Sequence, residues 1–560
     1  MPCEEAPYAE NYYDLMVSYT NLSNEYLPRG CIQPVDKDYE ILYLPMEGLP
    51  ELNALNYTYT AIPKCYTILA RAAMEASGIT RVQNQPTLSL KGQGILMGFL
   101  DTGIDYQHPA FRNSDGTTRI VRIWDQTLPG EAPTGFLYGT EYQKAEIDAA
   151  LRLDDPLSLV PEQDENGHGT FLAGLAAGSE LRENDFTGAA PFSQIIMVKL
   201  KAAKQYLKDY YFIPDDAVAY AESDIMTAIS YLTKVAEELK RPMVICIGLG
   251  SNSGDHGGNN VLAGYLNYVA TKRNLAVVVA GGNEVNARHH YYGEIAATEK
   301  TEMVEINVED EMPGFSVEMW SKAPELYQVS VISPTGERVP WIRARRGERE
   351  VYRFIFENTV LSIDYRIVGI RTGDQLIYLR FQNPTRGIWS IEVSGEYNIN
   401  GAYNMWLPIS GLIAGRVNFV RSNPDMTITV PGNAEVPMTV AAYDAADDSI
   451  YMNSSRGYTV GGFVKPDYAA PGVNVYGPEP NGRFGTRTGS SVSAAVAAGA
   501  SALYLEWAVE RGNNTGINSV EVKNDFVRGA VRKLERSYPN REWGYGTLNL
   551  YQTFEQLRST

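Results

Sequence analysis

The sequence predicts an α/β fold in which a parallel sheet is flanked by helices and a separate all-β module is inserted into the chain. Three apolar segments of strand length, at 95–103, 243–251 and 275–283, are bounded by glycines or polar turns. Continuous apolar runs of this length are typical of strands buried on both faces of a sheet. Segments with helical spacing at 223–240 and 259–274 alternate with them, and this order is that of a right-handed parallel α/β sheet.

The inserted module is indicated by a change in the residue pattern between residues 302 and 430. Short segments rich in β-branched and aromatic residues, separated by polar turns, predict a β sandwich there. Helical patterning returns at 490–512. An N-terminal segment, residues 1–58, contains the strand-like YEILYLPM, and we expect a helix to start in MEGLPELNA, so that this segment is a small α+β unit.

Length and charge limit the classes of function. A chain of 560 residues is too long for one core, so we expect one large domain with additions. The net charge of −19 argues against a nucleic acid or an anionic membrane as the main partner. The N-terminus lacks the basic region and apolar stretch of a signal peptide, and no run of about 18 apolar residues predicts a membrane span. We expect synthesis in the cytoplasm, or export by a route that the sequence does not show.

The four cysteines, Cys3, Cys31, Cys65 and Cys246, lie far apart and form no CxxC pair. Their spacing fits neither a metal site nor a disulfide framework. Cys246 stands inside the apolar run MVICIGL, so we expect it to be a buried thiol.

Two candidate catalytic residues follow from position and residue type. Asp101 ends the first apolar run, and ligands of open parallel sheets collect at the carboxyl ends of strands. The alternative is an aspartate that caps the turn DTGID. His168 lies between two glycines in NGHGTFLAG, where a structural histidine is the alternative.

Ser491 and Asn283 complete the set. Ser491 stands before a helix of small residues, where an ordinary N-cap serine is the alternative. An acid, a histidine and a serine together supply the orienting group, the base and the nucleophile of a covalent hydrolase. Asn283 follows the third apolar run and two glycines, where its amide can stabilise an oxyanion or simply form a turn.

In this order the four motifs resemble those of subtilisin-like serine proteases, the subtilases, over about 62–300 and 431–555. The segments FLDTGIDYQHPAF, NGHGTFLAGLAAG, VVVAGGNE and GSSVSAAVAAG carry the resemblance. It implies that Ser491, and not the alternative Ser490, is the nucleophile, with Asp101 and His168 as its triad partners and Asn283 in the oxyanion hole. It also implies that a peptide substrate adds as a strand beside the pocket residues Gly248, Leu249, Gly250, Gly281 and Gly282.

The chain is also similar to the Csp subtilases of spore-forming clostridia. That resemblance implies a prodomain (1–58) that is cut off by the enzyme itself and stays bound, a catalytic domain in two parts (59–301 and 431–560) and an inserted jelly roll (302–430). We expect the cut at Tyr57, Thr58 and Tyr59, with residues 55–58 left in the cleft. The expected partners are a protein substrate and the retained prodomain, the expected state is a monomer, and the expected setting is the spore, where the protease activates a zymogen such as a cortex hydrolase.

Two alternative functions stay open at this point. One is a pseudoprotease scaffold, which the intact triad disfavours. The other is a glycan-binding scaffold, in which Trp320, Trp341, Trp389 and Trp406 of the β module would stack on sugar rings. We expect no cofactor, and calcium stays open: some subtilisins bind calcium, but the sequence has no compact carboxylate loop of the EF-hand kind. The HH at 289–290 and DHGG at 255–258 are predicted to be surface loops and not metal ligands.

Overall fold

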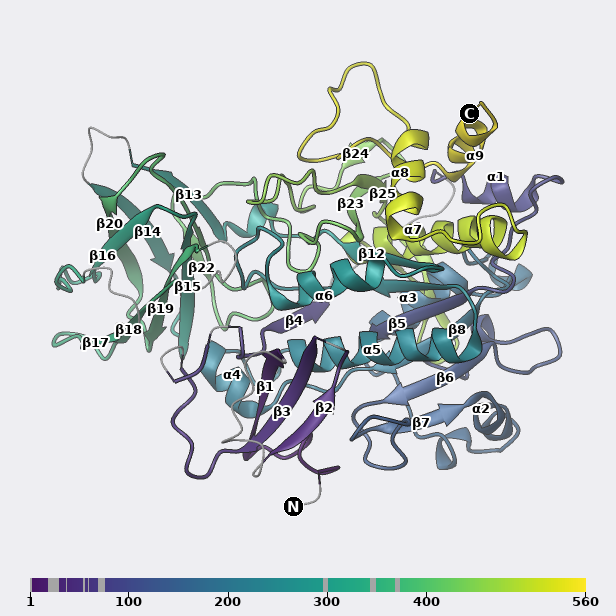
Figure 1. Cartoon of the computed structure of the whole chain (residues 1–560), viewed down its shortest axis with the longest axis horizontal. Coiled ribbons are helices and arrows are strands. Elements are labelled where there is room, and N and C mark those ends of the chain that lie inside the picture. Colours follow the sequence, from purple (N-terminus) through teal and green to yellow (C-terminus); the bar gives the residue numbers. More distant parts are fainter. Residues whose placement is uncertain are drawn as a thin grey trace.

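The protein was analysed as a computed structural model, in which residues 3–18, 30–36, 38–53, 56–58, 60–68, 76–295, 301–342, 349–367 and 373–559 are described. A large α/β body holds the central sheet, a β sandwich lies at one end of it, and a small N-terminal sheet lies along one side (Figure 1). The predicted fold class is confirmed: a mostly parallel sheet flanked by helices, with an added all-β unit.

The central sheet has the strand order β24-β23-β12-β10-β5-β8-β6-β7, with β25 beside β23. Neighbours from β23 to β6 pair in parallel, while the edge strands β24 and β7 pair antiparallel. The bounds are β5 Leu96–Asp101, β6 Ile120–Asp125, β7 Thr140–Gln143, β8 Gln194–Lys199, β10 Met243–Ile247, β12 Leu275–Ala280, β23 Met438–Asp444, β24 Ser449–Ile450 and β25 Tyr468–Pro471.

The three predicted apolar strands are β5, β10 and β12, and every residue in them is buried. They lie side by side at the centre of the sheet, with β10 between the other two. Because both faces are covered, neither face needs polar side chains, which is why these strands are continuous apolar runs rather than alternating ones.

Helices cover both faces of this sheet. Successive side chains of a strand point to opposite faces; accordingly Met97 of β5 belongs to the same apolar cluster as α3 and α7, and Leu96 to the same cluster as α5 and α6. The helices are α1 Ile79–Asn84, α2 Lys144–Ala150, α3 His168–Ala177, α4 Gln205–Tyr211, α5 Glu222–Leu239, α6 Val261–Ala270, α7 Ser490–Leu505, α8 Ser519–Gly529 and α9 Leu550–Ser559, with a π-helical turn Glu506–Glu510 after α7.

The helix that follows the Gly-Ser-Ser motif, α7, is buried along its whole length. Its Ser, Ala, Val and Gly residues allow neighbours to approach closely: a Cβ added to Gly499 would lie 2.2 Å from the Cβ of Ala189. Residues 490–510 are long and apolar enough to cross a membrane by length and composition, but 89% of their most apolar 18-residue stretch is buried inside the protein, as in the core helix of a globular body.

The β sandwich consists of two antiparallel sheets. The six-stranded sheet contains β13 His290–Glu294, β21 Ala402–Trp406, β15 Gly314–Ser321, β19 Gln375–Gln382, β18 Val360–Ile367 and β17 Arg349–Arg353; the four-stranded sheet contains β16 Leu326–Ile332, β20 Gly387–Tyr397, β14 Thr301–Val308 and β22 Val417–Phe419. The two inner faces share one apolar cluster, in which Phe315 stacks on Phe381. The sheets begin at His290 and end at Phe419, whereas the sequence places the module at 302–430, because β13 pairs with β21 within the sandwich.

The N-terminal segment forms a three-stranded antiparallel sheet with the order β1-β3-β2, from Tyr12–Ser18, Tyr39–Pro45 and Cys31–Pro34. Up to residue 58, its described residues form strands and turns and contain no helix. The predicted helix start in MEGLPELNA forms turns instead. Pro50 stands inside this motif, and proline disfavours helical backbone at the residue before it.

A disulfide joins Cys3 to Cys31, which the sequence analysis did not expect. Cys31 begins β2, and folding brings the N-terminal turn to it across 28 residues of sequence. Spacing along the chain gives no information about such a pairing, because it depends on where the turn packs. Cys246 and Cys65 are free and buried, which confirms the prediction for Cys246.

The helix start predicted at Ser223 also differs. Helix α5 begins at Glu222 with Ala221 as its N-cap, so Ser223 lies in the first turn. Glu222 and Asp224 occupy the same turn, where negative charge interacts favourably with the helix dipole.

Candidate active site

Three side chains from distant parts of the chain form a hydrogen-bonded line. His168 Nδ1 lies 2.7 Å from Asp101 Oδ1, and His168 Nε2 lies 3.2 Å from Ser491 Oγ. All three are buried within the protein. The structure thus brings together the acid, the base and the hydroxyl that the sequence analysis singled out, in the arrangement in which a histidine can take a proton from a serine.

Each of the three is held by regular structure. Asp101 is the last residue of β5, His168 is the first residue of α3, and Ser491 is the second residue of α7. Strand β5 and the two helices belong to one buried apolar cluster, which fixes the three side chains relative to each other. The backbone N–H of Ser491 is one of the four at a helix N-terminus that have no partner inside the helix.

A glycine makes the close approach around Ser491 possible. A Cβ added to Gly248 would lie 3.1 Å from the Cβ of Ser491 and 3.2 Å from Cε1 of His168. Contacts of this kind are tighter than nearly all real Cβ contacts. Gly248 therefore leaves space beside the triad that a larger residue would fill.

Asn283 and Ser490 join the loop after β12 to the start of α7. The backbone N–H of Ser490 donates to Asn283 Oδ1 at 3.0 Å, and the backbone N–H of Gly282 donates to Ser490 Oγ at 3.0 Å. With its Oδ1 engaged, Asn283 retains the amide N–H groups of Nδ2 as donors. These two bonds separate the roles of the adjacent serines, because the hydroxyl of Ser490 holds the loop while that of Ser491 faces His168.

Sequence reasoning missed Asp164, which organises the start of α3. Its Oδ1 accepts hydrogen bonds from Thr102 Oγ1 and the N–H of Gly167, and its Oδ2 accepts them from the N–H and hydroxyl of Thr170. Thr102 Oγ1 in turn accepts from the N–H of Gly169. Asp164 therefore links the residue after Asp101 to the turn that carries His168. The signal for it was an aspartate shortly before a helix start, a type of residue that favours capping positions.

A second carboxyl near the triad is Glu162. Its Oε1 accepts a hydrogen bond from the N–H of Ile104 at 3.0 Å. Burial raises the pKa of Glu162 well above the usual range of a glutamate, and the Ile104 hydrogen bond offsets only part of this effect. Burial therefore disfavours the ionised form of Glu162.

The glutamate that follows Asn283 is in the opposite situation. Burial acts to raise the pKa of Glu284, but hydrogen bonding and charge from His289 outweigh it and lower the pKa overall. His289 Nδ1 lies 3.0 Å from Glu284 Oε2, and Asn252 Nδ2 donates to the same oxygen at 3.0 Å. Glu284 is therefore an ionised, paired group behind the loop that carries Asn283.

A short antiparallel sheet adjoins the triad. Its order is β11-β4-β9, formed by Leu249–Gly250, Cys65–Ile68 and Tyr220–Ala221. In the register, Ile68 lies opposite Leu249, and Thr67 opposite Gly250. The strand position beside Leu249 and Gly250, where the sequence analysis expected a peptide substrate, is thus taken by the chain's own N-terminal part.

This arrangement corrects the expected occupant of the cleft. The prediction places residues 55–58 there, but β4 lies further along the chain; of the predicted cleavage residues, Tyr59 lies outside the described residues. The Tyr57 ring packs on Tyr13, and the N–H of Met16 donates to Ala61 O. These contacts keep the chain near Tyr57 and Thr58 against β1, so it reaches the cleft only after residue 61.

The predicted pocket glycines lie on both sides of the triad. Gly248, Leu249 and Gly250 follow β10, while Gly281 and Gly282 follow β12, the adjacent strand of the sheet. All five are buried. The structure thus brings together these two loops, from parts of the chain about 30 residues apart, at the same edge of the sheet, as parallel strands require.

The histidines predicted to lie in surface loops are buried instead. His256 stacks on Trp406 of the sandwich with 4.1 Å between ring centroids, and His290 packs on the same tryptophan. Burial lowers the pKa of both histidines to about 4. Among the described residues, no group of three or more His, Cys, Asp or Glu side chains could hold a metal ion.

The tryptophans of the sandwich bear on the glycan alternative. Trp320, Trp389 and Trp406 are buried, and Trp341 is 39% exposed. Three of the four candidate stacking surfaces are therefore covered by protein.

Comparison with known proteins gives a consistent result. A family profile described as "Subtilase family" matches residues 92–328 and 412–546. The solved structure of the Clostridium perfringens CspB protease is similar at a TM-score of 0.78 and 30% identity, covering 87% of this chain and 99% of that one. The subtilisin of Bacillus sp. (strain TA39) is 26% identical over 243 residues, and the C5a peptidase of Streptococcus pyogenes serotype M1 is 21% identical over 450 residues. The chain covers 46% and 34% of the length of these two curated relatives.

Proposed function

The chain belongs to the subtilase family, and we propose that it is a serine endopeptidase whose nucleophile is Ser491. The observation that carries the proposal is the hydrogen-bonded line from Asp101 through His168 to Ser491. A serine hydroxyl without a base is a weak nucleophile, and this line supplies the base and the group that orients it.

In the proposed mechanism, Ser491 Oγ attacks the scissile carbonyl while His168 Nε2 takes its proton. His168 then gives this proton to the leaving amine. Asp101 accepts the hydrogen bond from His168 Nδ1, which keeps the imidazole in the right tautomer and stabilises its protonated form. Water repeats the same steps on the acyl-enzyme, so that the carboxylic acid product is released and the serine is restored.

The oxyanion would be bound by two donors, the Nδ2 amide of Asn283 and the backbone N–H of Ser491. Ser490 supports this role because its hydroxyl accepts from the N–H of Gly282 and its own N–H donates to Asn283 Oδ1, which leaves Nδ2 as the donor group of this amide. Donors fixed before the reaction stabilise the developing charge without reorganisation.

We further propose that the enzyme cuts its own chain just after β4, and that the N-terminal segment (residues 1–68 and the adjoining residue up to the cut) acts as a prodomain. Strand β4 pairs with both β9 and β11, as an extended peptide substrate does when it adds to a sheet. Ile68, the last residue of β4, lies opposite Leu249, and Leu249 directly follows Gly248, which lies next to Ser491. The register therefore supports a cut shortly after Ile68.

An active-serine probe and N-terminal sequencing test this proposal together. A fluorophosphonate should label the purified chain at Ser491, and the cut chain should begin shortly after Ile68. In a Ser491→Ala variant, both labelling and cutting should disappear. A wild-type chain that is neither labelled nor cut would contradict the proposed activity. A new terminus near residue 59 would contradict the proposed cleavage position but would support the activity.

For the biological setting, we propose activation of another protein's zymogen during spore germination, such as a cortex hydrolase. The support is the resemblance to clostridial Csp subtilases, together with the similarity to the CspB protease of Clostridium perfringens. Incubation with a cortex hydrolase zymogen should yield one trimmed product, and the Ser491→Ala protein should yield none. General degradation of the zymogen would count against this role.

A further inference from the structure

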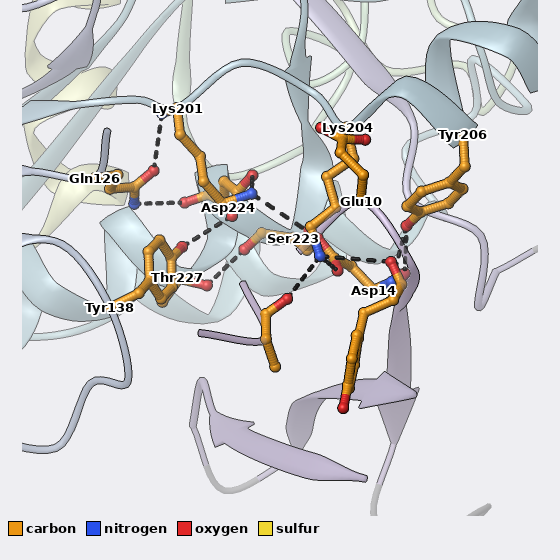
Figure 2. A network of polar contacts seen from close by, with 12 residues as sticks. Glu10, Asp14, Gln126, Tyr138, Lys201, Lys204, Tyr206, Ser223, Asp224 and Thr227 are labelled. Carbon is orange, nitrogen blue, oxygen red and sulfur yellow. Dashed lines mark hydrogen bonds and ion pairs between the residues drawn. The ribbon is translucent and has the colours of Figure 1, made fainter. Parts of the chain in front are cut away.

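Four buried charged groups lie between the N-terminal sheet and the α/β body, away from the triad. Asp14 comes from β1, whereas Lys201, Lys204 and Asp224 come from the body (Figure 2). We call these four residues the Asp14 cluster. Each of their side chains is at most 7% exposed.

Two ion pairs of this cluster, Lys204–Asp14 and Lys201–Asp14, cross the boundary between the two parts, while Lys201–Asp224 lies within the body. Lys204 Nζ lies 2.6 Å from Asp14 Oδ1, and Lys201 Nζ lies 2.7 Å from Asp224 Oδ2. Lys201 Nζ also lies 3.9 Å from the second oxygen of Asp14. Lys204 further donates to the backbone carbonyl of Ala6 at 2.8 Å, so this one ammonium holds the N-terminal turn as well as β1.

Neutral polar groups and the exposed carboxylate of Glu10, whose charge acts on Lys201, complete the surroundings. Tyr138 donates to Asp224 Oδ1, and the N–H of Asp14 donates to the hydroxyl of Tyr206. Gln126 accepts from the N–H of Lys201. Burial raises the pKa of Asp14 against the opposing charges of Lys204 and Lys201, and burial lowers the pKa of Lys204. Asp14 and Lys204 therefore depend on each other's charge to stay ionised away from water.

The charge of the cluster is balanced only when the N-terminal segment is in place. Two carboxylates then face two ammonium groups. Removing only Asp14 from the assembled protein would leave two buried ammonium groups with one carboxylate. Breaking a buried pair from one side costs far more than the intact pair contributes, because it leaves an uncompensated charge away from water.

The cleft strand is by comparison a small contact. Strand β4 has four residues, and β11 and β9 each have two. Once the chain is cut, the strand would stay in the cleft because the rest of its segment holds it at high local concentration. Retention of the strand then depends on how firmly β1 and its neighbours are bound.

We propose that Asp14 is the anchor by which the cut N-terminal segment stays bound, so that the Asp14 cluster sets how long the active site remains blocked. This rests on the proposed self-cleavage. The partner of this surface is the chain's own N-terminal segment, and the recognised chemistry is a single carboxylate entering a buried pair of lysines.

The test uses the full chain after it has cut itself. The cut protein is incubated with a fluorophosphonate, and the rate at which Ser491 is labelled reports how often the cleft opens. Gel filtration under native conditions shows whether the N-terminal segment still co-elutes. Asp14→Asn should release the segment at least about 30-fold more readily than wild type and should speed labelling correspondingly. Glu47→Gln, which changes an exposed carboxylate of the same segment, should behave as wild type.

If the Asp14→Asn protein does not fold, further variants test the same proposal. Lys204→Met breaks the same pair from the other side and should also release the segment. The double variant Asp14→Asn with Lys204→Met restores the charge balance, and should retain the segment at least about tenfold better than either single variant. A cut Asp14→Asn or Lys204→Met protein that keeps its segment and labels at the Glu47→Gln rate would overturn the anchor. A wild-type chain that stays uncut on a denaturing gel would instead overturn the self-cleavage on which the anchor depends.

Discussion

The triad and the Asp14 cluster are both buried polar groups, yet they are built differently. The triad joins three elements of the α/β body, and its middle member is a histidine, whose unperturbed pKa lies close to neutral pH. The Asp14 cluster joins two parts of the chain, and its members are aspartates and lysines, which ordinarily titrate far from neutral pH.

The triad is therefore suited to moving a proton, and the Asp14 cluster is suited to holding two parts of the protein together. In the triad, His168 can take the proton of Ser491 as the hydroxyl attacks and can release it again, because imidazole changes its protonation state near neutral pH. In the Asp14 cluster, the ionised groups attract each other at all times. An arrangement that left one of these buried charges without its partner would be unfavourable. We therefore expect that changes in the triad slow the reaction with the fold intact, whereas changes in the cluster weaken the assembly with the chemistry intact.

The largest effect on chemistry tests the triad side of the comparison. Asp101→Asn keeps the shape of the side chain but favours the wrong tautomer of His168, so self-cutting should slow by about 10⁴-fold. The first-order rate of appearance of the new N-terminus in refolded protein measures this. The midpoint of chemical unfolding, measured in the Ser491→Ala background, should stay close to that of the control. A normal cutting rate would show that Asp101 does not orient His168.

Next comes the matching change in the Asp14 cluster. Asp224→Asn removes one carboxylate that faces the ammonium of Lys201, and this should destabilise the protein by about 3–5 kcal/mol. Urea unfolding of the uncut Ser491→Ala background measures the loss. Cutting should proceed within a few-fold of the wild-type rate among molecules that have folded. A slow cut with unchanged stability would reverse the distinction drawn between the two clusters.

Asn283→Ala is expected to have an intermediate effect, because it removes one of two oxyanion donors. The loss measured in a subtilisin for the corresponding donor, about 10²–10³-fold in kcat, is the guide for this residue. The self-cutting rate is again the readout, and Asn286→Ala, which changes an exposed amide a few residues later, is the matched control. Equal cutting rates for the two variants would show that Asn283 does not bind the oxyanion.

The smallest effect is expected at Ser490. Ser490→Ala removes the acceptor for the N–H of Gly282, a bond of about 1 kcal/mol, so the cutting rate should fall by about tenfold or less. Ser490→Thr retains the hydroxyl and should recover most of the rate. A loss of several orders of magnitude in Ser490→Ala with no recovery in Ser490→Thr would make Ser490 the nucleophile in place of Ser491.

The parts of the fold that the sequence predicted are those with local signals. Strands β5, β10 and β12 are continuous apolar runs because each is covered on both faces. This burial can be recognised in a stretch of six residues or fewer. The same holds for α7, where small residues record a tightly packed helix. Asp101, His168, Asn283 and Ser491 were identified because each follows or begins such an element within a recognisable motif.

What the sequence could not provide are the contacts made between remote segments. The Cys3–Cys31 disulfide, the burial of His256 and His290 against Trp406, and the pairing of Asp14 with Lys204 leave no pattern along the chain. The strand in the cleft is the clearest case. Its identity depends on the contacts of Tyr57 with Tyr13 and of Ala61 with Met16, which hold these residues against β1 and fix where the chain next becomes free to extend.

By itself, the sequence therefore determined the layered α/β body and the residues able to carry out the chemistry. Only the tertiary structure decided which stretch of chain occupies the cleft and which carboxylate joins the N-terminal sheet to the body. The physical reason is that periodicity and motifs record the immediate environment of a segment. The matching of one buried charge or one strand to a distant partner is a property of the assembled surfaces, and many sequences with the same local pattern would lack it.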